Sequence, residues 1–499
     1  MDTILNAVAR ANDAINGIVW GWPALILLAF AGVFTTCITK FFQLVHLKHW
    51  FRNTIGAIFL DKHITKHTKD RTISQFQSLC TTLAATVGTG NIAGVASAIV
   101  TGGPGAVFWM WCIAFFGMMT IFSENVLGIL YRVRNQHGEW SGGAMYYLKY
   151  GLGSKKGCKQ IGKLLAVLFA FFCLMASFGI GNMTQVNTIA KNMQTAFSVP
   201  TFVSGIVILI IAGLVIIGGI KRIALVTEKI VPIMVFAYLF GTLFICAVHI
   251  GQFKEVFTSI FKSAFGLRAA AGGIVGSGVK MAVQMGLKRG IFSNEAGLGS
   301  TVMANSSSNV KEPVRQGMWG IFEVFGTLVV CTLTAFSILS SGLIDLGSGQ
   351  LIDKSIEAGS LVGVVFKNTF GAAGSWFVAI VLLMFAFSTI LGWSHYGTKA
   401  CEYLFGTEST LIYRIIFVIA IYGGAVMGEN LAWDLSDTFN GLMMLPNLIG
   451  VLILSPTVYK CTKNYADRHF RHKKIKPMLS VYEDVQKFQE EALKHDENN

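Results

Sequence analysis

The chain has 499 residues, of which 53% are hydrophobic and only 13% are charged. A soluble domain carries about 25% charged residues, so the composition excludes a soluble protein and indicates one that crosses a membrane many times. The formal net charge of +14 is compatible with nucleic-acid binding. However, the basic residues lie in loops between apolar segments, where they set membrane orientation instead.

Eleven apolar segments approach the length of a membrane-spanning helix, roughly 20 residues. They cover residues 18–38, 74–101, 106–130, 164–190, 200–220, 224–250, 272–301, 315–341, 375–400, 411–426 and 433–456. The loop 40–71 carries seven lysines and arginines against two aspartates. The positive-inside rule therefore predicts that this loop is cytoplasmic, that the N-terminus lies outside the cell and that the C-terminus is cytoplasmic.

The segment 74–101 is apolar, but its centre reads Val-Gly-Thr-Gly-Asn at residues 87–91. Inside a helix, glycine costs about 1 kcal/mol relative to alanine, and unpaired backbone groups in lipid are also costly. Such residues at mid-membrane make sense where the helix unwinds and its freed backbone groups bind something polar. The sequence therefore predicts a broken helix at 87–91.

A second stretch, 286–300, reads GLKRGIFSNEAGLGS and has the same conflict between an apolar setting and helix-breaking or charged residues. Two interrupted segments, one in each half of a chain, are the strongest sequence indication of a secondary-transporter binding site. If the first of the eleven segments is set aside, the broken segments take positions one and six of ten. Because five is odd, two successive groups of five have opposite orientations, which predicts an inverted repeat.

This arithmetic predicts four parts of the chain. Residues 1–72 form an N-terminal transmembrane helix and a basic, amphipathic cytoplasmic loop. Residues 73–250 form the first repeat, and residues 251–456 form the second. Residues 457–499 form a cytoplasmic C-terminal tail.

Several stretches resemble the bacterial and archaeal alanine/glycine:cation symporter family. They are TVGTGNIAGVASAIVTGGPGAVFWMW, GGAMYYL, FGIGNMTQVN, GIFSNEAGLGS and FSTILGW. The family is similar to the leucine-transporter-fold superfamily, whose first core helix breaks at a comparable motif. The resemblance implies an all-α polytopic membrane protein of about 11 transmembrane helices. These would form a 5+5 inverted repeat with broken first and sixth core helices, plus one extra N-terminal helix.

The resemblance also implies which residues bind the substrate. They are Thr89, Gly90, Asn91, Gln185, Phe292, Ser293, Glu295 and Trp393. Exposed amides at a half-helix N-terminus suit a carboxylate. A glutamate within the membrane is a functional candidate, because it can accept hydrogen bonds from an ammonium group.

Structural explanations stay open for each of these residues. The glycines can serve close helix packing, and Asn91 can cap the half-helix that follows. Glu295 can pair with Lys288 or Arg289. Gln185 can make an ordinary interhelical hydrogen bond, and Trp393 can simply pack.

For the coupling ion, the resemblance implies a sodium site. Its candidate ligands are the carbonyls of Ala84 and Val87 and the hydroxyls of Ser388 and Thr389. Na⁺ is satisfied by neutral oxygens at an unwound turn. The alternative for the two hydroxyls is hydrogen bonding to their own helix. Glu124 and Glu323 also lie within apolar segments, so coupling to protons stays open.

The prediction is a multi-pass prokaryotic cell-membrane symporter that couples uptake of alanine or glycine to sodium by alternating access. It needs no cofactor beyond the ion, and neither nucleic acid nor an obligate protein partner. The main alternative is a sodium- or proton-coupled carrier of another neutral amino acid, such as glutamine or serine. A membrane enzyme is disfavoured because no nucleophile–base pair or metal cluster is evident, and a channel because no filter motif is.

Overall fold

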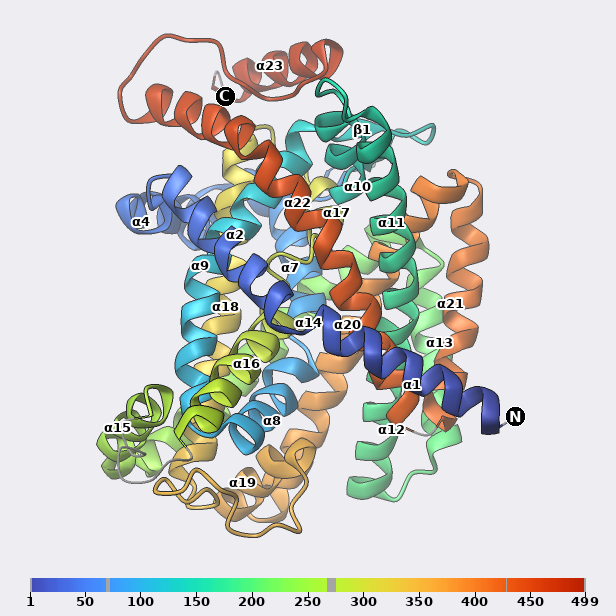
Figure 1. Cartoon of the computed structure of the whole chain (residues 1–499). Helices are drawn as coiled ribbons and strands as arrows, with labels where there is room; N and C mark the ends of the chain where they lie inside the picture. The colour runs from blue at the N-terminus through green and yellow to red at the C-terminus, as the bar shows by residue number, and fades with distance from the viewer. Residues whose placement is uncertain (1, 69–71, 267–274, 428, 498–499) are drawn as a thin grey trace.

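The computed structural model describes residues 2–68, 72–266, 275–427 and 429–497, and these parts of the chain are almost entirely helical (Figure 1). Eight of the described helices are long and apolar enough to cross a membrane, and a bent pair of helices makes a ninth span. The described strands are β1 (Val133–Arg134) and β2 (Trp140–Ser141), which pair antiparallel in one short hairpin. The all-α polytopic class is confirmed.

The elements before residue 200 include the first bent pair. They are α1 (Asp2–Val19), α2 (Trp22–Ile38), α3 (Phe42–Val45), α4 (Leu47–Asn53), α5 (Ile55–Leu60), α6 (Lys62–Thr65), α7 (Gln75–Thr86), η1 (Thr89–Asn91), α8 (Ala93–Gly102), α9 (Gly105–Leu130), α10 (Ala144–Tyr146), η2 (Tyr147–Leu152), α11 (Lys159–Phe178), η3 (Gly179–Met183) and α12 (Thr184–Phe197).

The later elements include the longest helices. They are α13 (Thr201–Ile216), α14 (Gly219–Val248), η4 (Ile250–Gln252), α15 (Phe253–Ala264), α16 (Val275–Asn294), α17 (Val302–Ser306), α18 (Pro313–Ser340), η5 (Ala358–Ser360), α19 (Leu361–Phe370), α20 (Ala372–Phe405), α21 (Ser409–Val426), α22 (Glu429–His469) and α23 (Glu483–Glu497).

The bundle has an apolar belt and two distinct ends. Large apolar side chains on its outer helices are exposed, among them Phe236, Phe240 and Ile419, as expected where lipid covers the protein. Figure 1 shows α4, β1 and α23 at one end and α8, α15 and α19 at the opposite end.

Local sequence sets where the spanning helices begin. Ser74 and Gln77 form a reciprocal capping box at the start of α7, with bonds of 3.1 Å in both directions. This arrangement satisfies two of the amides that the first turn leaves free. Pro313 begins α18, a position where its missing N–H costs nothing.

Each predicted segment is matched by helix in the described parts of the chain, but some bounds differ. The last segment was predicted to end at residue 456, whereas α22 continues through Pro456 to His469. Residues 272–274 of the second broken segment lie outside the described residues. The segment 164–190 contains a π-helical turn, η3, that was not predicted. The count of eleven and the inverted repeat stay predictions.

Candidate functional site

The first break interrupts α7 at Val87 and Gly88, and the helices on either side are bent by 62°. A single 3-10 turn, η1, follows before α8 resumes. The Asn91 side chain accepts a hydrogen bond from the backbone N–H of Gly88 at 3.2 Å. The Asn91 carbonyl accepts one from the Thr334 hydroxyl at 3.0 Å. The predicted break at 87–91 is therefore confirmed.

The second break begins where α16 ends at Asn294 and lasts until α17 begins at Val302. Glu295, Gly297 and Gly299 all have positive φ angles (54°, 91° and 75°), a conformation that favours glycine and is strained for glutamate. The predicted interruption in 286–300 is confirmed, although residues 286–294 are still helical.

The first break and the last turns of α16 line a common cleft of about 310 Å³, together with Asp437 from α22. The residues lining the cleft include Thr89 and Gly90 from the first break and Phe292 from the end of α16. A methyl group placed on Gly90 would lie 2.9 Å from Phe292 Cδ1, closer than carbon atoms can pack. Only glycine at position 90 therefore allows this approach.

The other predicted substrate residues do not line this cleft. The Thr89 hydroxyl donates to Gln185 Oε1 at 3.2 Å, and Ser293 Oγ lies 2.9 Å from the sulfur of Cys331. Asn91 is fully buried, and its Nδ2 has no hydrogen-bond partner among the described residues. A buried donor left over in this way is a candidate to bind a ligand.

Glu295 does not line the cleft either. Its carboxylate accepts a hydrogen bond from Trp393 Nε1 at 3.1 Å and one from the Ser300 hydroxyl at 2.5 Å. Lys288, the cation offered as its alternative partner, instead pairs with Asp437 at 3.0 Å. The structure therefore joins Glu295 to Trp393, both buried, rather than to Lys288.

The predicted sodium ligands meet where α7 packs against α20. Ser388 Oγ lies 3.2 Å from the carbonyl of Ala84. A methyl group on Gly88 would be 2.6 Å from Thr389 Oγ1, so this hydroxyl reaches the first break next to Val87. Both hydroxyls also donate to the Phe385 carbonyl at 2.9 Å. Bonding to their own helix and proximity to the break therefore coexist.

Sequence reasoning missed several polar residues that hold the breaks. Thr334 supports the first break, and Ser300 and Asn447 support the second. Asn447 was detectable as a lone amide in the apolar run MMLPNLIG. Thr334 and Ser300 had no distinguishing signal, because hydroxyl residues are common in membrane helices.

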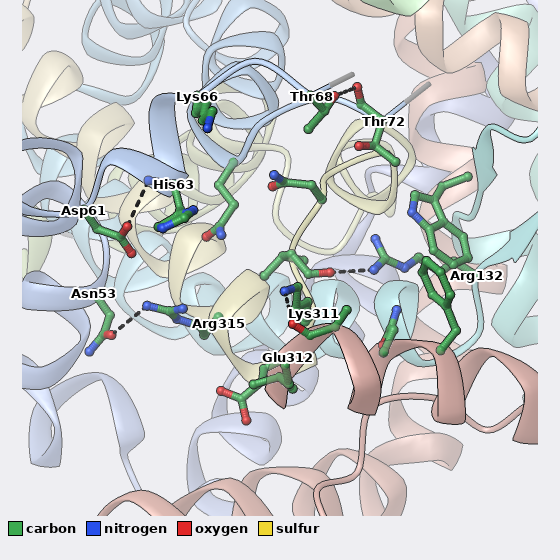
Figure 2. A pocket seen from close by; sticks show the side chains of 18 of the residues that line it. Asn53, Asp61, His63, Lys66, Thr68, Thr72, Arg132, Lys311, Glu312 and Arg315 are labelled. Carbon is green, nitrogen blue, oxygen red and sulfur yellow. Dashed lines mark hydrogen bonds between the residues drawn. The ribbon is translucent and has the colours of Figure 1, made fainter. Parts of the chain in front are cut away.

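A larger cleft, of about 570 Å³, lies beside α23 (Figure 2). Its lining is more basic than acidic, with side chains such as Lys66, Arg132 and Arg315. Arg132 is buried and donates to the carbonyls of Ser306 and Ser308 at 3.1 and 2.6 Å. It thereby anchors the segment that follows the second break. None of the predicted site residues lines this cleft, so its size does not make it the substrate site.

Two helices that unwind within one membrane bundle are typical of secondary transporters. In agreement, the fold is similar to that of MhsT, solved in complex with L-phenylalanine. The TM-score is 0.53 at 12% sequence identity, covering 79% of this chain and 99% of MhsT. This likeness concerns the fold alone.

The sequence comparisons identify the family. The model of the sodium:alanine symporter family matches residues 5–479. The sodium/alanine symporter AgcS of Methanococcus maripaludis is 43% identical over 455 residues, covering 91% of this chain and 96% of AgcS. The probable sodium/glutamine symporter GlnT of Bacillus subtilis is 36% identical, covering 95% of this chain and 93% of GlnT.

The chain therefore belongs to the sodium:alanine symporter family. It is a secondary amino-acid symporter, a multi-pass protein of a prokaryotic cell membrane, and not an enzyme.

Proposed function

We propose that the protein couples the uptake of a small neutral amino acid, alanine or glycine, to sodium. The observation that carries this proposal is the single cleft lined by Thr89 and Gly90 from one broken helix and by Phe292 from the other. An amino acid bound there contacts both halves of the fold at once. Its binding therefore depends on how the two halves are arranged, which is the requirement for alternating access.

The substrate carboxylate is proposed to bind at the first break. The N-terminal end of α8 offers unpaired amides and a partial positive charge, and Asn91 Nδ2 is an additional free donor. Glu295 is the proposed partner of the ammonium group, and Gln185 and Ser293 are proposed as further polar contacts of the substrate. Small size is favoured because Phe292 fills one side of the cleft.

Sodium is proposed to bind beside the substrate, to the carbonyls of Ala84 and Val87 and the hydroxyls of Ser388 and Thr389. These groups are neutral oxygens in a buried setting, which suits Na⁺ at an unwound helix. An ion there fixes the shape of the first break and so raises affinity for the amino acid. By thermodynamic linkage, the amino acid raises affinity for sodium by the same factor.

We further propose that the end carrying α23 is cytoplasmic, because basic side chains line the cleft there. The cleft beside Thr89 then opens outward. In this scheme residues 73–250 and 251–456 are the two inverted repeats, and each begins with its broken helix.

The test is uptake by proteoliposomes that contain the purified protein. An inward sodium gradient should drive accumulation of alanine or glycine above its external concentration, and replacing sodium with choline should abolish it. Equilibration without accumulation, or accumulation that is indifferent to sodium, would contradict the proposal. A panel that includes glutamine tests the second candidate, which the similarity to GlnT favours.

A further inference from the structure

A third buried carboxylate, Glu124, lies beside the second break and has no part in the proposed sodium site. It is on the spanning helix α9 and is fully buried. Its Oε1 accepts a hydrogen bond from Asn447 Nδ2 at 2.5 Å. Its Oε2 is buried and accepts no hydrogen bond from another side chain that the structure describes.

Asn447 connects this carboxylate to the unwound segment. The same Nδ2 group donates to the carbonyl of Gly297 at 2.8 Å, and a methyl group on Gly299 would lie 2.7 Å from the Asn447 side chain. The Asn447 Oδ1 atom accepts a hydrogen bond from the Tyr147 hydroxyl. Asn447 therefore packs directly on two of the positive-φ residues of the second break.

The titratable groups that face Glu124 offer no positive charge. They are Tyr147 from η2, Glu295 from the second break and Glu323 from α18. On α16, Lys288 pairs with Asp437, and Arg289 lies over the ring of Phe292. Helix α2 has no charged residue in its sequence. Across the described residues, the surroundings of Glu124 are neutral or acidic.

An ionised carboxylate is strongly disfavoured in such a place, because it is removed from water and only neutral groups donate to it. A bound metal cation needs several converging oxygens, whereas the nearby Asn447 oxygen already accepts from Tyr147. A bound proton does not need several converging oxygens. We propose that Glu124 is a proton-binding site whose occupancy is linked to the conformation of the second break.

The proton comes from bulk water and returns to it. Glu124 holds it while the second break has the shape described here, and releases it when that segment rearranges and water reaches the carboxylate. Low pH then favours the present conformation, since a ligand stabilises the state that binds it. This inference rests on the proposed symport, because it makes the transport cycle sensitive to pH.

The first test measures thermal unfolding of the purified full-length protein from pH 6 to pH 9. Folded protein with a protonated Glu124 binds one proton more than the unfolded chain, so stability falls as pH rises. The unfolding constant should rise by up to about tenfold per pH unit from this group. In Glu124→Gln, residue 124 is neutral at every pH. The rise of the unfolding constant per pH unit should therefore be smaller than in wild type by the contribution of this one group.

The matched control is Glu312→Gln. Glu312 is also buried, but it pairs with Arg468 and His469. These partners hold the pKa of its carboxyl below the usual range, so it carries no proton between pH 6 and pH 9. We expect the pH slope of this variant to stay close to wild type. Equal loss of slope in both variants would overturn the assignment to Glu124, because burial alone would then explain the effect.

The second test follows sodium-driven alanine uptake by the same three proteins across the same pH range. Wild type and Glu312→Gln should share one pH profile, and that of Glu124→Gln should be flatter. If Glu124→Gln keeps the wild-type pH dependence in both uptake and stability, the proposal is wrong while symport stands. If wild type fails to accumulate alanine, symport is wrong, and the unfolding measurement still decides the role of Glu124.

Discussion

The two helix breaks differ in the groups that hold them. The first break is surrounded by neutral partners, namely the hydroxyls of Thr334 and Thr389 and the amide of Gln185. The second contains a carboxylate at a positive φ angle, Glu295, and has a further carboxylate, Glu124, beside it. The first break therefore offers neutral oxygens and free donors, which suit a sodium ion and a carboxylate. The second concentrates acidic groups, which suit an ammonium group or a proton.

The largest effect is expected where the first break meets the end of α16. In Gly90→Ala the new methyl group meets the ring of Phe292 at 2.9 Å, and such overpacking costs about 1–3 kcal/mol. Transport of alanine should fall by at least about tenfold, as measured by initial uptake rates. Gly326→Ala, where nothing lies within 4 Å of the new methyl group, is the control and should transport normally. Normal transport by Gly90→Ala would show that the breaks need not approach so closely.

The next prediction concerns the ion at the first break. Thr389→Ala removes the hydroxyl beside Gly88 without adding bulk. The sodium concentration for half-maximal uptake should rise about tenfold, equivalent to about 1.4 kcal/mol, and the order of preference among amino acids should not change. A changed preference among amino acids with unchanged sodium dependence would show that Thr389 serves the substrate and not the ion.

Glu295→Gln tests whether the charge of the second break serves the substrate. Glutamine can still accept from Trp393, but it has no charge for an ammonium group. We expect the alanine KM to rise severalfold, by about 1 kcal/mol in binding. Ser300→Ala, which removes only the partner hydroxyl, should have a smaller effect. An unchanged KM in Glu295→Gln would make Glu295 a structural residue of the turn.

The smallest effect is expected for Glu312, which lies between the second break and α18. Burial alone would raise the pKa of Glu312, but the hydrogen bond from His469 and the charge of Arg468 hold it below its usual range. A depressed pKa stabilises the folded protein at neutral pH, and this stability is lost as pH falls through the folded-state pKa. Glu312→Gln should therefore lower stability by about 0.5–1 kcal/mol at pH 7, and the difference from wild type should shrink near pH 4.

The control for this last prediction is Glu408→Gln, at the start of α21. We expect no pH-dependent difference between that variant and wild type in thermal unfolding. A deficit in Glu312→Gln that persists at low pH would mean that packing, and not charge, accounts for its role.

The sequence alone predicted both breaks, because glycine pairs and a glutamate in apolar segments conflict with continuous helix. It also predicted that Ala84 and Ser388, more than 300 positions apart, belong together, and they lie in contact. This second prediction came from family resemblance, since pairing between distant helices leaves no local pattern.

Other features could not be predicted for physical reasons. Lys288 stands seven positions before Glu295 in the sequence, yet it pairs with Asp437 from α22, because tertiary packing decides which charges meet. The π-helical turn η3 places Gly181 against Trp393, and a glycine in the motif FGIGN does not distinguish a π-turn from an ordinary helix. Helix α22 continues beyond Pro456, where the sequence suggested an end.

We propose that the two broken helices form one site in which sodium and the amino acid stabilise each other's binding. The decisive measurement is equilibrium binding of labelled alanine to the purified protein, in sodium chloride and in choline chloride at the same pH. Sodium should tighten alanine binding at least about tenfold, or about 1.4 kcal/mol of coupling, and Thr389→Ala should remove most of this gain. Alanine binding of equal affinity in both salts would show that the ion and the amino acid do not share a coupled site.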